Sequence, residues 1–139
     1  MPASVITSGR QTLFFPILVK RGVPPQGCPI GGLNHEHEKG RGLVWALEKQ
    51  IALYAQQHPG SDQSLRQTLQ EIVKLYHHHL WMENAMVFPV AEKLISDDDN
   101  RELMIKFGDL DRAIGPGVVA RLEQFATSLS LQVGTAAAG

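Results

Sequence analysis

YHHHLWMENAMVFPVAEKL, residues Tyr76–Leu94, is the stretch that decides the fold, because three histidines and a glutamate here sit inside a helical pattern. From Leu65 to Leu94 one position in every three or four falls on the same face, which is the period of an α-helix. The residues on this face are Leu65, Leu69, Ile72, Tyr76, His79, Glu83, Met86, Val90 and Leu94. The pattern predicts one long helix whose apolar stripe is interrupted by His79 and Glu83, one turn apart.

A second apolar stripe, between Leu33 and Tyr54, is interrupted by His37. Burying three ionisable side chains without partners would cost several kcal/mol each. A metal ion or a closed hydrogen-bond network must therefore compensate. Imidazole and carboxylate together suit iron, zinc or manganese, and two histidines with one carboxylate match a non-haem iron facial triad. The predicted metal ligands are His37, His79 and Glu83, and no catalytic residue is assigned.

Glycine, proline and aspartate clusters divide the chain at residues 22–32, 58–62, 96–100 and 115–117. The segments between them have the helical period, and few strand signals compete. The predicted fold is all-α, an antiparallel up-and-down helical bundle that is incomplete within one chain. We assign residues 1–132 to one helical domain and 133–139 to a flexible tail.

Composition excludes several classes of function. The chain has 139 residues, a net charge of −1 and one cysteine, Cys28. A nearly neutral chain offers no basic field for nucleic acid, and its short apolar run at 13–19 cannot span a membrane. A single cysteine allows no internal disulfide and fits a reducing compartment. We therefore expect a cytoplasmic protein without nucleic-acid or membrane partners.

A short Phe-Pro motif occurs twice in the chain. Phe15–Pro16 and Phe88–Pro89 lie 73 positions apart, and a proline inside a helix bends it in the same way at both places. The repeat places Arg10 at the position equivalent to Glu83, and Ile6 at the position equivalent to His79. Neither residue is a good metal ligand.

Taken together, four motifs resemble the hemerythrin-like, or HHE cation-binding, family. The resemblance implies a four-helix bundle around non-haem iron that binds oxygen or another small diatomic ligand, or handles iron. It matches His37 to the histidine of the family's third helix and His79 and Glu83 to the pair in its fourth. The resembling stretches are LFFPILVKRGVPPQGCPIGG, EHEKGRGLVWAL, HHHLWMENAMVFPVAEKLIS and IGPG.

The chain also departs from the family pattern. The family's first helix and part of its second are missing, and with them about half of the usual ligands. Three alternatives remain open: one metal ion per chain, a metal-free helical module in which Arg10 pairs with Glu83, or a fuller site rebuilt by two chains. An apolar face left by the missing helix favours a homodimer in all three. An enzymatic role has little support, because no second catalytic motif is present.

Overall fold

The computed structural model describes the backbone of residues 2–115 and 117–136, and the side chains of residues 11–115 and 117–132. These residues form helices and connecting turns, with no strand among them, so the predicted all-α class is confirmed. In the described part of the chain, no helix is both apolar enough and long enough to cross a bilayer. The elements are α1 (Pro2–Lys20), α2 (Ile30–Ala55), α3 (Ser61–Met82), the π-helical turn η1 (Glu83–Val87), α4 (Phe88–Leu94), α5 (Asp97–Ile114) and α6 (Val118–Ala136).

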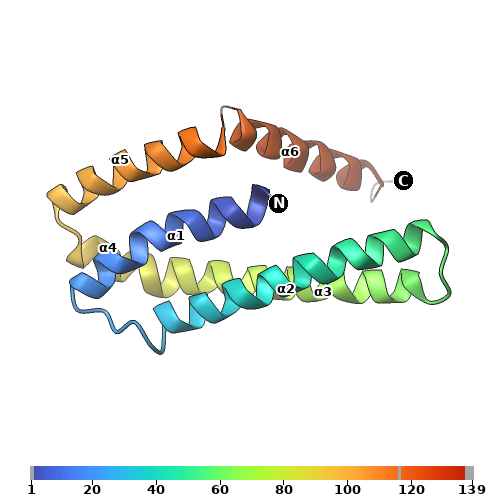
Figure 1. Ribbon diagram of the computed structural model, residues 1–139, viewed down its shortest axis with the longest axis horizontal. Helices are drawn as coiled ribbons and strands as arrows, with labels where there is room; N and C mark the ends of the chain where they lie inside the picture. Colours follow the sequence, from blue (N-terminus) through green and yellow to red (C-terminus); the bar gives the residue numbers. More distant parts are fainter. Residues whose placement is uncertain (1, 116, 137–139) are drawn as a thin grey trace.

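Two helices form an antiparallel hairpin along most of the length of the molecule. α2 and α3 pack against each other throughout and are joined by a turn at the far end of the hairpin (Figure 1). α1 packs on α2 and also on α5, so it lies between the hairpin and the C-terminal helices. α5 and α6 follow one another in a row above α1 (Figure 1). This arrangement brings α1, α2 and α3 together at one end of the hairpin.

The buried core lies at the end of the molecule where α1, the start of α2 and η1 meet. Leu18, Ile30, Leu33 and Val87 are its fully buried side chains. The buried face of α3 shares His79 with the face expected from the sequence but is rotated away from part of that face. Its buried members are Leu75, His79 and Met82, whereas Leu69 and Tyr76 of the predicted stripe are exposed.

The predicted long helix is present as one continuous segment, but its hydrogen bonding changes from α-helical to π-helical at Glu83. Pro89 has no N–H, so the α-helical hydrogen bond to the carbonyl of residue 85 cannot form. The chain instead widens into the π turn η1, in which the Phe88 N–H bonds the Glu83 carbonyl. π turns of this kind often accompany functional sites. Glu83 is the first residue of this turn.

The ends of the helices agree with the predicted breaks, with local differences. α2 begins at Ile30, inside the segment expected to be a loop. The N-cap of α3 is Gly60 in a left-handed conformation that favours glycine. α6 continues to Ala136, so its helix runs into the segment assigned to a tail, and residues 137–139 lie outside the described part.

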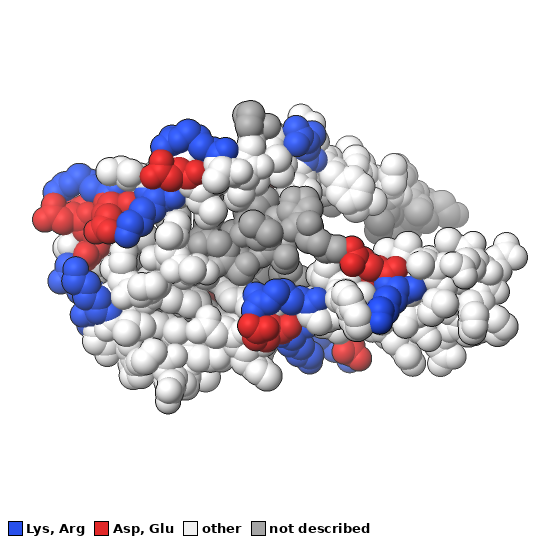
Figure 2. Space-filling view, viewed as in Figure 1, with Lys and Arg blue, Asp and Glu red and all other residues white. Residues whose placement is uncertain are grey.

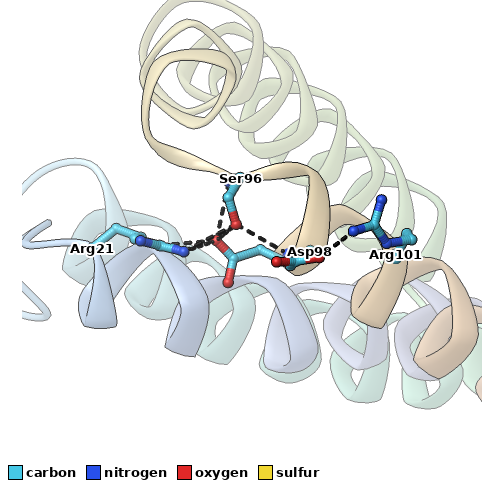
Figure 3. Close-up of polar contacts among 5 residues, drawn as sticks. Arg21, Ser96, Asp98 and Arg101 are labelled. Carbon is cyan, nitrogen blue, oxygen red and sulfur yellow. Dashed lines mark hydrogen bonds and ion pairs between the residues drawn. The ribbon is translucent and has the colours of Figure 1, made fainter.

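A polar cluster fixes the end of α1 to the start of α5 (Figure 3). Ser96 caps α5 by accepting from the Asp99 N–H at 3.2 Å, and its own N–H donates to the Asp99 carboxylate at 3.0 Å. Arg21 donates from Nε to Asp99 Oδ2 at 2.8 Å and from Nη2 to Ser96 Oγ at 3.0 Å. The pKa of Asp99 is lowered to about 2, first by the hydrogen bonds from Ser96 and then by Arg21. Ser96 and Asp99 thus cap α5 and, through Arg21, also hold the start of α5 against the end of α1.

Replacing Ser96 by alanine is expected to destabilise the protein by about 1 kcal/mol, which is the usual cost of removing an N-cap side chain. Urea unfolding followed by circular dichroism measures this change. Ser128→Ala is the matched control, because the exposed Ser128 hydroxyl bonds the Phe125 carbonyl of its own helix. Equal stability of the two variants would contradict a capping role for Ser96.

Candidate metal site

His79 is the central residue of the candidate site. Its side chain is 4% exposed and lies on the buried face of α3. Its Nδ1–H donates to Glu36 Oε2 on α2 at 3.0 Å. With that proton on Nδ1, Nε2 is unprotonated and carries a lone pair, and Nε2 lies 3.6 Å from Glu83 Oε1. A histidine fixed by a carboxylate in this way is the usual form of a metal-binding imidazole.

His37 lies beside His79 on the facing helix. The two ring centroids are 5.0 Å apart, and Phe15 of α1 stacks on the His37 ring with a centroid distance of 6.4 Å. The buried Nε2 of His37 has no hydrogen-bond partner among the described residues. Burial, followed by the neighbouring His79 and Arg41, lowers the pKa of His37 from 6.5 to about 4. His37 is therefore a neutral imidazole at pH 7. Of the three predicted ligands, His79 thus has His37 beside it across the hairpin and Glu83 beside it one turn along its own helix path.

Gln11 of α1 is a member of the site that sequence reasoning missed. It is buried, and its amide Nε2 donates to Glu83 Oε1 and lies 3.3 Å from His79 Nε2. Its Oε1 is buried without a hydrogen-bond partner in the described part of the chain. The spacing of Gln11, Phe15 and Leu18, four and then three, places them on one face of α1 and could have revealed it.

The repeat pointed to the neighbouring position instead of Gln11. It placed Arg10 at the position equivalent to Glu83 and Ile6 at the position equivalent to His79, and the side chains of both residues lie outside the described residues. The predicted pairing of Arg10 with Glu83 therefore stays a prediction. The described partner of Glu83 from α1 is Gln11.

A second histidine connects the site to the surface. The exposed His78 bonds Glu36 Oε1 through Nδ1 at 2.5 Å, while the other oxygen of Glu36 serves His79. Glu36 is thus held between one surface imidazole and one buried imidazole. His77 is exposed and bonds the Val73 carbonyl. Only His79 of the three consecutive histidines faces the interior.

The side chains of the candidate site supply enough ligand atoms for a metal ion only if Gln11 is included among them. No group of three or more His, Cys, Asp or Glu side chains within the described residues is disposed to hold a metal ion. The Gln11 NH2 group lies between His79 Nε2 and Glu83 Oε1, two atoms that a cation would otherwise bind. Exchanging the amide oxygen and nitrogen would replace this donor by an acceptor. Two nitrogen and two oxygen atoms would then be available, a set that suits divalent transition metals.

No family model matches the chain, and neither a curated protein nor a solved structure does so. Function therefore has to be inferred from the residues of the site and the packing of the helices.

The lowered pKa of His37 predicts a pH dependence of stability without metal. The unfolded chain takes up a proton at this histidine below about pH 6.5, whereas the folded chain does so only near pH 4. The stability that depends on a neutral His37 is fully present above pH 6.5 and is lost as the pH falls toward 4. Between pH 7 and pH 5 the free energy of unfolding of the wild type should fall by roughly 1 to 2 kcal/mol more than that of His37→Gln. Urea unfolding at the two pH values measures both. Parallel losses in the two proteins would exclude this role of His37.

Proposed function

We propose that the protein binds one divalent transition-metal ion per chain, iron first, with zinc or manganese as alternatives. The ligands are His37, His79 and Glu83, joined by the Gln11 amide oxygen. One observation carries the proposal: buried His79 is oriented by Glu36 with its second nitrogen toward Glu83, next to the unpartnered Nε2 of His37. Buried polar atoms without partners are uncommon and require compensation.

Each protein residue has a distinct part in this proposal. Glu36 holds the His79 proton on Nδ1, which keeps Nε2 free as a donor to metal. Burial keeps His37 neutral and therefore able to bind. Rotation of the Gln11 amide turns an internal hydrogen-bond donor into a neutral ligand. A bound iron ion would supply redox chemistry and affinity for O2 or another small diatomic molecule.

The resemblance to hemerythrin-like proteins supports the same proposal from the sequence. In that interpretation α1, α2 and the α3–η1–α4 path correspond to three helices of an up-and-down bundle, and α5 and α6 lie beside them. Two irons per chain would need more ligands than the described residues offer, since each structural or catalytic metal takes about three or four protein ligands. One ion is therefore the preferred stoichiometry.

A metal-free helical module is the second candidate function. The observation that favours it is the Gln11 amide, which bonds both His79 and Glu83 and so closes a hydrogen-bond network without a cation. Such a protein would act through its surface rather than through its interior. Its stability would not depend on metal.

A thermal-shift titration distinguishes the two candidates. The protein is stripped with chelator and titrated separately with Fe²⁺ under anaerobic conditions, Zn²⁺, Mn²⁺ and Mg²⁺. Binding to the folded state should stabilise it by about 2.7 kcal/mol at one hundred times Kd, with Mg²⁺ as the oxygen-preferring control. An unfolding temperature unchanged by all of the transition metals would support the metal-free module.

A further inference from the structure

Among the described side chains, apolar stripes of equal length run along α3 and α6, the first exposed throughout and the second exposed at its later residues. The α3 stripe consists of Leu69, Val73, Tyr76 and Leu80, with exposed fractions between 38% and 54%. The α6 stripe consists of Val118, Leu122, Phe125 and Leu129, of which Phe125 (61%) and Leu129 (43%) are exposed while Val118 and Leu122 are half-buried. Each stripe has steps of four, three and four residues, and each therefore runs for about 17 Å along one helix face. Isolated exposed apolar residues are common, but continuous stripes mark interaction surfaces.

We propose that these stripes cover each other in a twofold homodimer, in which α6 of each copy packs along α3 of the other. Each copy supplies both surfaces, so one symmetry axis creates two identical contacts and leaves neither stripe exposed. The matching residue steps allow the two rows of side chains to interdigitate as in ordinary helix packing. α6 follows α5 beyond the end of α1, as a projecting helix (Figure 1).

The amount of apolar surface is sufficient for a stable dimer. With about 200 Å² for a large apolar residue, the two stripes together expose roughly 700 Å² per copy. A dimer would therefore bury about 1,400 Å² from the stripes alone, within the range of specific interfaces.

Charge does not oppose the approach of two copies. The chain carries a net charge of only −1, and α6 has one basic and one acidic residue, Arg121 and Glu123. Figure 2 shows charged side chains gathered around the start of α5, whereas the outer end of the hairpin is largely uncharged on the face shown. A second copy therefore meets apolar surface with little repulsion.

Light scattering coupled to size exclusion tests the pairing through two opposite-charge variants. Wild type should elute as a dimer, whereas Val73→Lys and Phe125→Glu should each be monomeric with unchanged helical circular dichroism. An equimolar mixture of the two variants should recover a dimer, because the introduced lysine of one chain meets the introduced glutamate of the other and the second contact is wild type. Ile105→Glu on the exposed face of α5 is the control and should remain dimeric.

Each other outcome overturns the proposal in a recognisable way. A monomeric wild type would show that α6 does not pair with a second copy. A dimer that survives Phe125→Glu but not Val73→Lys would indicate α3 packing on α3. Failure of the mixture to dimerise would exclude the crossed contact even if both single variants are monomers. None of these outcomes depends on metal, so the proposed interior site is tested separately.

Discussion

His79→Ala is expected to abolish metal binding, with a loss of affinity greater than about 100-fold. Removal of an outer partner of a metal ligand already costs 10- to 100-fold, and His79 is the ligand itself. The variant also removes the buried donor to Glu36 Oε2, which is left without that hydrogen bond, so it should be less stable by about 2 kcal/mol. Metal affinity is measured by competition with a coloured chelator, and stability by urea unfolding.

His77→Ala is the matched control for this experiment. It removes an imidazole from the same helix, two residues away, but this imidazole is exposed and bonds a backbone carbonyl of its own helix. Its affinity for metal should equal that of wild type. Glu36→Gln should be intermediate, with a 10- to 100-fold loss, because it weakens the orientation of His79 without removing a ligand. Equal affinities in all four proteins would place the metal elsewhere.

Gln11→Glu is expected to make stability depend on metal. In the metal-free protein the new carboxylate faces Glu83 Oε1, which now accepts from the Gln11 amide, and two buried carboxylates repel each other. The metal-free variant should be destabilised by about 3 kcal/mol. The added negative charge should raise metal affinity at least about tenfold, so saturating metal should restore most of the lost stability.

Gln67→Glu makes the same chemical change on the exposed face of α3 and should leave both stability and affinity unchanged. The decisive comparison is the unfolding temperature of Gln11→Glu with and without transition metal. Destabilisation that metal does not reverse would favour the closed hydrogen-bond network of the metal-free module.

The sequence predicted the helices, and it predicted that His79 would lie near His37 and Glu83. Local period and breakers locate helices without knowledge of their packing, and polar interruptions of an apolar stripe identify His37, His79 and Glu83 as interior groups. The meeting of His37 with His79 follows from hairpin packing, because α2 and α3 run antiparallel and bring the two rings side by side.

Other features of the structure depend on tertiary packing, which the helical period of the apolar residues does not reveal. The buried face of α3 is centred on Leu75, His79 and Met82, because α2 and α1 cover only that side, and Tyr76 is left exposed. Gln11 was missed because the repeat was aligned on Phe15–Pro16 and Phe88–Pro89, which placed Arg10 at the position of Glu83. The π turn before Pro89 contains one residue more than an α-helical turn, and α1 need not contain this extra residue. The position equivalent to Glu83 is therefore shifted by one residue.

Elemental analysis of the wild-type protein, purified from iron-supplemented cells without chelator, tests the central claim most directly. His79→Ala purified alongside it provides the background. A metal-binding interior built from Gln11, His37, His79 and Glu83 predicts about one transition-metal ion per chain in wild type and almost none in the variant. Equal, near-zero metal in both proteins would contradict it, and two ions per wild-type chain would show that the ligand set is wrong.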